Sequence, residues 1–560
     1  MRQYVRFTWI ILVCFTLAAC SRTAPRLGGD VGSAPPAPTS ALVQAPVAGT
    51  VAPVENPAVT TASSGPTIQI QTDGPARPFD RRLLGTNLPA WVGPDTLRDE
   101  TFQARTTALG ATLLRLPGGS WSNAYDWLAC ENGDTQGCAW PWAARPTDFL
   151  NFLRATGHSG MWTVSINGTA QEAAALVAFF NGSIDDQTLI GVDVRGRDWQ
   201  TVGHWARLRS EHGNPEPLPI LLWEVGNEVY GGKPANGGAE CAPWGWEEVW
   251  TCDGMEYVNG VGEGAERHEG YLEFRTAMRA VDPAIQVGAV GVDQPDGWSN
   301  WGNEVIDAAG EQLDFYVVHH YAYDKTPPAP EVILAQPRRT WPRLLDKLKG
   351  ALAQQAGGSQ TPIAVTEYNL VAFQDLDTNQ FMRRAVNALF VADTLGQLAE
   401  QGVIIANQWD LANGRAENGT DYGLIDPTSG ARSPQYYALL LWSRFGDELL
   451  PVNSTLPTDT DLSLYAGHAA DGSLRILAIN KTAQSIDATI QIGSTGTYAA
   501  QADTMSADAL TAEQVLFNGV ADPADDLSDA PARQIESFEN SLEQSFPAFS
   551  ITLLQLTPTS

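Results

Sequence analysis

Two glutamates each follow an apolar segment of the chain. Glu228 ends the segment Trp223-Glu224-Val225-Gly226-Asn227-Glu228, and Glu367 lies in Val365-Thr366-Glu367-Tyr368-Asn369. Two carboxyl groups roughly 5 Å apart can cleave a glycosidic bond with retention of configuration, because one protonates the leaving oxygen while the other attacks the anomeric carbon. The two glutamates are far apart in sequence, so this chemistry requires elements that bring their segments together.

Strand-like runs alternate with helix-like stretches over residues 81–446 and predict an α/β fold, a (β/α)8 TIM barrel. The eight runs are Leu83–Asn87, Thr112–Pro117, Met161–Asn167, Ile220–Glu228, Ile285–Gly291, Phe315–Tyr321, Ile363–Tyr368 and Val403–Leu411. A capping box, Thr169 with Glu172, precedes the apolar-periodic stretch 173–180, and Trp341–Gln355 is amphipathic. The alternative, a doubly wound open sheet, lacks its Gly-rich phosphate motif.

Active sites of such barrels lie at the C-terminal ends of the strands, so the fourth and seventh runs would present Glu228 and Glu367 at one mouth. These strand ends resemble those of the clan A glycoside hydrolases. Within that clan, the most similar family is family 51, the α-L-arabinofuranosidases, and the resemblance extends from about Leu83 to the end of the chain. The motifs that carry it, besides the two glutamate segments, are Leu114-Arg115-Leu116-Pro117-Gly118-Gly119 and His319-His320-Tyr321.

The resemblance implies a retaining, double-displacement O-glycosyl hydrolase with Glu228 as general acid/base and Glu367 as nucleophile. It also implies that Asn227 binds the hydroxyl next to the anomeric centre. Strand alternation places His319 and Tyr321 on one face and His320 on the other. Tyr321 would then hydrogen-bond the nucleophile.

Three further residues are candidates for the site. We expect Arg115 to orient the carboxylates or to keep Glu367 ionised, and Trp409 to form the floor of the sugar site. Glu224 shares the face of Glu228 but lies deeper, as a buried partner. The alternative for Arg115, as for His319 and Tyr321, is a satisfied structural residue of the barrel, and for Trp409 it is core packing.

The chain departs from the family pattern at two sugar-contacting positions, where it offers Asn87 in place of a Glu and Ser120 in place of an Asn. Such changes alter the sugar that a pocket accepts, because an unpaired buried polar group discriminates strongly. Aromatic insertions follow the second and fourth runs and either enclose a longer glycan or pack on themselves. Their aromatic residues are Trp121, Tyr125, Trp127, Trp140 and Trp142 in the first and Trp244, Trp246 and Trp250 in the second.

Four cysteines lie beyond the N-terminal segment. An even number in an oxidising compartment predicts two disulfides. Among the three connectivities we favour the local pairs, Cys130 with Cys138 and Cys241 with Cys252, since each closes a short loop. A zinc site is the alternative, but no CxxC spacing supports it.

The N-terminal segment has the features of an export signal. Arg2 and Arg6 precede an apolar run, 9–17, that is too short to span a membrane. Leu17-Ala18-Ala19-Cys20 resembles a bacterial lipobox, in which the cysteine is lipidated; a plain signal peptide is the alternative. We therefore expect a signal peptide over 1–19, lipidation of Cys20, and an exported lipoprotein at the cell surface or in the periplasm.

Composition divides the rest of the chain. Residues 20–66 are rich in Pro, Ala and Thr and form a tether, and 67–80 contain a strand that joins a later sheet. Residues 447–560 predict an antiparallel β-sandwich. Its expected strands are Leu462–Gly467, Leu474–Lys481, Ile486–Ile492 and Ser550–Leu556, interrupted by an acidic surface excursion over Asp503–Glu543.

The formal net charge of −30 argues against a nucleic-acid partner. The expected partners are a carbohydrate substrate, suited to the 18 Trp, and a membrane only through the lipid anchor. A two-carboxylate mechanism needs no metal or other cofactor, and no motif indicates an oligomeric state. An α-L-arabinofuranosidase-like hydrolase is favoured, with three alternatives: a β-xylosidase or an endo-β-glucanase of the same clan, or a non-catalytic carbohydrate-binding surface protein.

Overall fold

The computed structural model of the protein describes residues 65–233, 241–243, 247, 249–355, 360–457, 461–494 and 496–559. The expected signal peptide, Cys20 and nearly all of the tether lie outside the described residues, as do Trp244 and Trp246. Within the described ranges, no helix is both long and apolar enough to cross a membrane.

Eight parallel strands close into a barrel in sequence order, with the last pairing to the first. All eight expected strands are confirmed, most of them shorter than predicted. They are β3 (Gly85–Asn87), β4 (Leu113–Leu116), β5 (Ser159–Val164), β6 (Leu222–Val225), β9 (Gln286–Val290), β10 (Phe315–Tyr323), β11 (Ile363–Val371) and β12 (Ile405–Gln408).

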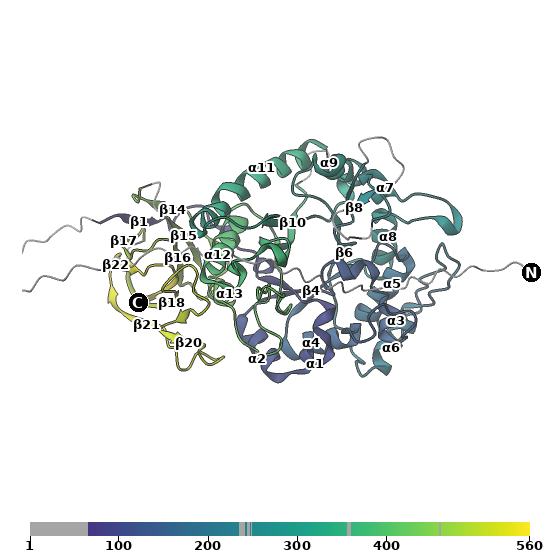
Figure 1. Cartoon of the computed structure of the whole chain (residues 1–560), viewed down its shortest axis with the longest axis horizontal. Coiled ribbons are helices and arrows are strands. Elements are labelled where there is room, and N and C mark those ends of the chain that lie inside the picture. Colours follow the sequence, from purple (N-terminus) through teal and green to yellow (C-terminus); the bar gives the residue numbers. More distant parts are fainter. Residues whose placement is uncertain are drawn as a thin grey trace, which may run out of the picture. The chain divides into compact units, whose positions relative to one another are not determined.

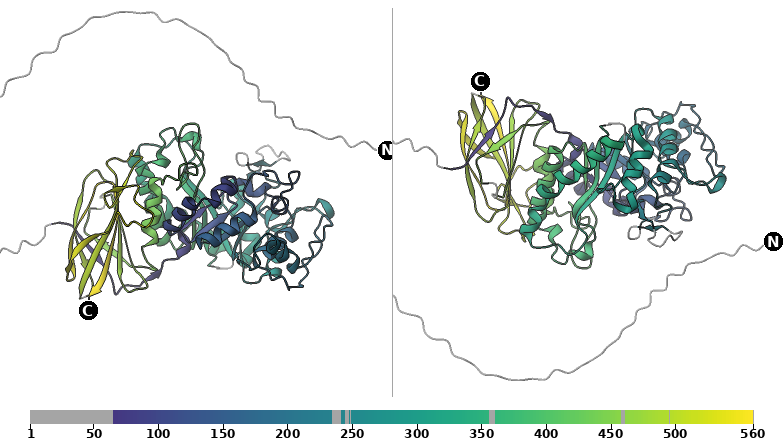
Figure 2. Two further views of the ribbon diagram at one scale, coloured as in Figure 1. Left: turned by 90° about the horizontal axis from the view of Figure 1, so that it is seen from below. Right: turned by 90° about the horizontal axis from the view of Figure 1, so that it is seen from above.

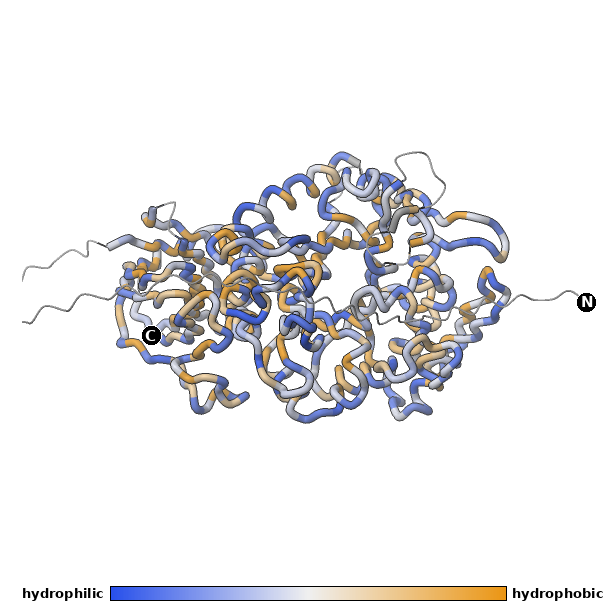
Figure 3. Tube along the Cα trace, in the orientation of Figure 1, coloured by the Kyte–Doolittle hydropathy of each residue, from blue (hydrophilic) through white to orange (hydrophobic). Residues whose placement is uncertain are grey.

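Helices surround the barrel (Figure 1). They are α1 (Gly93–Arg98), α2 (Glu100–Leu109), α3 (Trp127–Glu131), α4 (Pro146–Thr156), α5 (Ala170–Asn181), α6 (Val202–Glu211), α7 (Gly254–Asn259), α8 (Tyr271–Val281), α9 (Gly297–Ala309), α10 (Pro330–Leu334), α11 (Gln336–Gln355), α12 (Ala385–Glu400) and α13 (Pro434–Ser443). Thr169 caps α5 by accepting from the backbone N–H of Glu172. Hydrophilic and hydrophobic residues alternate along α11 (Figure 3), as in a helix with one polar and one apolar face.

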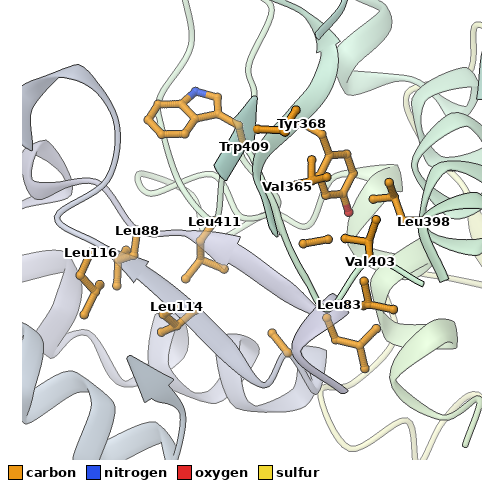
Figure 4. Packing of buried hydrophobic residues seen from close by; sticks show 14 of the residues in the cluster. Leu83, Leu88, Leu114, Leu116, Val365, Tyr368, Leu398, Val403, Trp409 and Leu411 are labelled. Atoms are coloured by element: carbon orange, nitrogen blue, oxygen red, sulfur yellow. The ribbon is translucent and has the colours of Figure 1, made fainter. Parts of the chain in front are cut away.

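Apolar side chains fill the barrel interior and the layer between strands and helices. The interior layer contains Leu113, Met161, Leu222, Phe315, Val317, Ala364 and Ile405. Outside the barrel, Tyr368 packs with Val365, Leu398 and Val403 between the strands and α12 (Figure 4). This packing leaves the strand ends as the place where polar side chains converge.

Two sheets form the C-terminal sandwich, which lies beside α12 and α13 (Figure 2). The first has the order β14-β1-β17-β22 and the second β15-β16-β23-β18-β19-β20, with β21 also paired to β18. The strands are β1 (Thr67–Ile70), β14 (Val452–Ser454), β15 (Leu462–His468), β16 (Leu474–Asn480), β17 (Ile486–Ile492), β18 (Thr497–Ser506), β19 (Leu516–Phe517), β20 (Val520–Ala521), β21 (Arg533–Phe538), β22 (Ser541–Phe546) and β23 (Ser550–Thr559). Two short ribbons complete the fold: β2 (Arg77–Pro78) with β13 (Glu448–Leu449), and β7 (Gly231–Gly232) with β8 (Ala242–Pro243).

Strand β1 precedes the barrel in sequence but belongs to the sandwich. It runs parallel to β17, with Ile68 opposite Ile490, and antiparallel to β14. This parallel pair is the exception in an otherwise antiparallel sandwich. Ile68 and Ile70 are fully buried in the sandwich core, so residues on both sides of the barrel sequence build one domain.

The prediction of a surface excursion over Asp503–Glu543 is wrong for much of that stretch. It contains the end of β18, all of β21 and the start of β22, which pairs with β17. In β22 the side chains of Leu542, Gln544 and Phe546 are buried and those between them exposed. Glu536 and Glu543 thus lie on exposed faces of strands, whereas most of the acidic residues lie in the segment between β18 and β21, where the described strands are the short β19 and β20.

Candidate active site

The chain turns sharply where β6 ends, and this turn presents Glu228. Gly226 has φ 84°, a conformation that favours glycine, and a Cβ there would also lie 3.0 Å from Val229. Glu228 itself has φ 46°. Such conformations occur where the surrounding structure holds a functional residue in place. The side chain of Asn123 holds the backbone of Asn227 from both sides, by donating to its carbonyl (2.7 Å) and accepting from its N–H (2.9 Å).

Glu228 and Glu367 meet at the barrel mouth beside His319. One carboxylate oxygen from each glutamate and one His319 nitrogen all lie within 4.8 Å of one another. His319 Nδ1 lies 2.8 Å from Glu228 Oε1, and its Nε2 lies 3.0 Å from the Thr366 hydroxyl. Tyr321 donates to Glu367 Oε2 at 2.7 Å. His320 points elsewhere and pairs with Asp293.

Arg115 occupies the base of the site with no exposed surface. Its guanidinium donates to Glu224, to Glu367 (2.8 Å), to Asn227 Oδ1 (2.7 Å) and to Asn87 Oδ1 (2.8 Å). Arg115 therefore joins the nucleophile to the deeper Glu224, which Thr163 also contacts at 2.8 Å.

Asn87 and Arg115 lie beneath the cavity. Asn87 is fully buried, and its amide donates to the Thr366 carbonyl (3.0 Å) while its oxygen accepts from Arg115. It is not among the residues that line the cavity, and neither is Arg115. Both side chains make hydrogen bonds at the base of the site, Asn87 to Arg115 and Arg115 to Glu367.

Burial and neighbouring charges shift the pKa values of these groups. Burial alone would lower the pKa of Arg115, but the charges of Glu224 and Glu367 outweigh it and raise that pKa. Burial also favours neutral His319, yet the glutamates raise its pKa. For Glu367, burial together with the charge of Glu228 raises the pKa, although His319, Arg115 and Tyr321 lower it. Arg115 thus favours the ionised nucleophile but does not reverse the direction of the shift.

Glu247 is a third carboxyl group of the site, and it was not among the residues predicted from the sequence. It is 7% exposed, lines the cavity, and accepts from Ser120 and from Asn123 (3.1 Å). Burial and the charge of Glu228 raise its pKa to about 9. Glu247 lies in an irregular insertion between Cys241 and Cys252, where no periodicity marks it. The one sequence feature that could have indicated Glu247 is its place among tryptophans in the segment that follows Glu228.

A cavity of about 1040 Å³ opens above the two glutamates. Its walls include Trp91, Trp121, Trp409 and Tyr422, and the loops 372–375 and 413–418. Trp409 is 8% exposed and lies against Gly119, where a Cβ would come within 2.3 Å of the indole. Gly119 is thus required, because the indole of Trp409 leaves no room for a side chain at this position.

Both expected local disulfides are present, Cys130 with Cys138 and Cys241 with Cys252. The aromatic residues of the first insertion divide into two groups. Tyr125 and Trp127 are buried, whereas Trp142 is 58% exposed. In the second insertion, Trp250 stacks on His268 with ring centroids 5.0 Å apart.

The spacing of Glu228, His319 and Glu367 also suits a divalent metal ion. The oxygens of Glu367 already accept from Arg115 and Tyr321, and the guanidinium would repel a cation there. The arrangement is therefore better suited to proton transfer and nucleophilic attack than to metal binding.

Comparisons with known proteins agree with this fold. A GH51 α-L-arabinofuranosidase structure from Thermotoga petrophila matches with a TM-score of 0.64 at 19% identity, covering 88% of this chain and all of that one. The arabinose complex of the Thermotoga maritima enzyme gives 0.63 at 20% identity, with 88% and 99% covered. A family 44 xyloglucanase from Paenibacillus polymyxa gives 0.56 at 14% identity, with 88% and 100% covered.

Sequence similarity is more limited. α-L-Arabinofuranosidase C of Emericella nidulans is 25% identical over 200 residues, 34% of this chain and 32% of that enzyme. The intracellular exo-α-(1→5)-L-arabinofuranosidase of Bifidobacterium longum is 25% identical over 231 residues, 39% and 33% of the two chains. The chain thus spans about a third of the length of the curated relatives it matches. No protein-family model matches it. The chain has the TIM-barrel fold of the GH51 α-L-arabinofuranosidases and resembles enzymes of that activity over part of its sequence.

Proposed function

We propose that the protein is a retaining glycoside hydrolase acting on plant or microbial polysaccharide or oligosaccharide. The observation that carries this proposal is the pair of carboxylate oxygens, from Glu228 and Glu367, within 4.8 Å in an open cavity. Retaining enzymes hold their carboxyl groups about 5–5.5 Å apart, whereas inverting enzymes need about 6.5–9.5 Å to admit a water. The separation supports retention.

In the first step Glu228 protonates the glycosidic oxygen while a Glu367 oxygen attacks the anomeric carbon. The C–O bond to the leaving group breaks, and a glycosyl ester forms on Glu367. In the second step Glu228, now ionised, deprotonates a water that attacks the same carbon and releases Glu367. Tyr321 and Arg115 hold the nucleophile, and His319, which also contacts the Thr366 hydroxyl, holds Glu228.

The nearest activity is that of an α-L-arabinofuranosidase, supported by the named relatives. A β-xylosidase or an endo-β-glucanase of the same clan is the alternative, supported by Asn87 and Ser120 at the two divergent positions. A non-catalytic carbohydrate-binding protein fits less well, because it has no need of the paired carboxylates.

A panel of nitrophenyl glycosides and polysaccharides tests the activity, followed by NMR of the first-formed product. We expect hydrolysis of at least one substrate and retention at the anomeric carbon. Inversion, or a complete lack of hydrolysis across furanosides and pyranosides, would contradict the assignment.

We also propose that residues 81–446 are the catalytic domain, that 447–560 with β1 form the sandwich, and that a lipid on Cys20 anchors the exported chain to a membrane. The two disulfides support export, since they persist in oxidising compartments. In the bacterial host, labelled palmitate should enter the wild type and not the Cys20→Ala variant. Label in both variants would contradict the anchor.

A further inference from the structure

A continuous series of indole rings leads from the catalytic cavity to the protein surface. Trp409 lies 5.9 Å from Trp91, and Trp91 lies 5.1 Å from Trp121, measured between ring centroids. Trp121 stacks flat on Trp140 at 3.9 Å and meets Trp142 edge-on at 5.5 Å. Trp91, Trp121 and Trp409 line the cavity, and Trp142 is 58% exposed. We call Trp91, Trp121, Trp140 and Trp142 the tryptophan wall.

Packing alone does not account for the tryptophan wall. Buried tryptophans elsewhere, such as Trp162 and Trp223, are at most 1% exposed. The wall instead leaves apolar rings open to solvent next to the reacting groups, at a cost in hydrophobic free energy. An exposed apolar patch at the edge of a ligand cavity is typical of a binding surface.

Hydrogen bonds and a disulfide hold the segments of the tryptophan wall in place before any ligand binds. The N–H of Ala144 donates to the carbonyl of Ala90 (2.9 Å), which joins the segment carrying Trp142 to the segment carrying Trp91. The Tyr125 hydroxyl donates to the Ala144 carbonyl (2.6 Å). Cys138, which is disulfide-bonded to Cys130, lies two residues before Trp140. A preorganised surface loses little conformational entropy when a ligand binds.

The rest of the cavity lining has a different chemistry. The loops 372–375 and 413–418 present amides and carboxylates, and the Asn413 amide links them by donating to Gln374 (3.2 Å). A sugar ring has an apolar face of C–H groups and an edge of hydroxyls. One aromatic wall and one polar wall therefore complement successive units of a glycan.

Charge narrows the class of glycan. Five carboxyl-bearing residues line the cavity: Glu228, Glu247, Glu367, Asp375 and Glu417. Among the described lining residues the one cation is Arg415, and its guanidinium already donates to Asp426 (3.1 Å). A uronic acid would therefore meet carboxyl groups and one cation that is already paired, whereas a neutral glycan needs no counter-charge in the cavity.

We propose that the tryptophan wall binds further sugar units of a neutral glycan chain, beyond the unit held at Glu228 and Glu367. This inference rests on the proposed function, because it assigns the chain that the catalytic site would cleave. It makes a polymer or oligomer of neutral sugars the substrate, in preference to a single-sugar glycoside.

Calorimetric binding to the full chain carrying Glu367→Gln tests the proposal without turnover. The probes are neutral arabino-, xylo- and gluco-oligosaccharides of one to six units, with an oligouronate of equal length. We expect affinity to rise with length in at least one neutral series, and Trp142→Ala to weaken the longest ligand about 5- to 10-fold. Leu189→Ala, which removes a 77% exposed apolar side chain outside the wall, should leave it unchanged.

Several outcomes overturn the proposal. They are length-independent affinity in every neutral series, equal effects of Trp142→Ala and Leu189→Ala, and tighter binding of the oligouronate. A self-association surface would instead show as a dimer in sedimentation that Trp142→Ala dissolves, with no loss of glycan binding. Failure of the proposed function is seen separately, as a wild type that binds the longer glycan through the wall yet hydrolyses nothing.

Discussion

The base and the wall of the cavity are built on opposite principles. At the base, Arg115 is fully buried and bonded to Glu224, Glu367 and Asn87, which lie on barrel strands, and to Asn227, two residues beyond the end of β6. The wall comes from irregular segments whose outermost ring, Trp142, is 58% exposed. The difference indicates that the barrel determines the chemistry and the inserted segments determine which glycan reaches it.

Removing the nucleophile should have the largest effect. Glu367→Ala leaves no group to attack the anomeric carbon, so turnover should fall by roughly 10⁴-fold or more. Azide should restore part of it, because a small anion can occupy the vacated space, and the product is then a glycosyl azide of inverted configuration. Glu536→Ala, on the exposed face of β21, is the control. Full activity of Glu367→Ala would contradict the role of Glu367 as the nucleophile.

Replacing the acid/base should have a graded effect. Glu228→Ala should lose about 10²- to 10⁴-fold on substrates with poor leaving groups, which need protonation. Nitrophenyl substrates with good leaving groups should keep much of their first step. Rates for a series of leaving groups measure this, and a uniform loss across the series would contradict the role given to Glu228.

Base and wall should also differ in stability. Arg115→Met leaves Glu224 and Glu367 buried without their cation, so it should lower the free energy of unfolding by about 3–5 kcal/mol. Arg415→Met lies in the polar cavity loop 413–418, where the side chain is 50% exposed. It should change the free energy of unfolding by less than about 1 kcal/mol. Urea unfolding measures both. Equal effects would mean that the base is not the stabilising layer.

The smallest effect concerns Glu247 and pH. Its pKa is about 9 in the folded protein and about 4.3 in an unfolded chain, so folding takes up a proton between these values. The stability that this group contributes is fully present below about pH 4.3 and is lost as pH rises towards 9. Glu247→Gln cannot ionise, so its advantage over the wild type should grow between pH 5 and pH 8, by no more than about 1.4 kcal/mol per pH unit. The same comparison with exposed Glu536→Gln should show no growth.

Much of the barrel could be predicted because its strands are uninterrupted apolar runs. Their ends were less predictable: the run expected over Ile220–Glu228 stops at Val225, since Gly226 turns the chain. Periodicity gave the faces of His319, His320 and Tyr321 correctly. Periodicity could not predict that Asn87 is fully buried, because this depends on Arg115, which bonds it from another strand. Glu247 escaped prediction since nothing local places an irregular insertion above the barrel mouth.

The position of β1 has a consequence for the order of folding. Its backbone pairs with Ile490 and neighbouring residues of β17, which leave the ribosome only after the entire barrel has been made. Until then the edge of β1 that pairs with β17 has no partner, and such an edge is prone to wrong pairing between chains. A chain shortened before β17 would keep all eight barrel strands but leave β1 without its parallel partner. The whole barrel segment is therefore synthesised before β1 can complete its pairing. Aggregation of truncated chains should depend on β1.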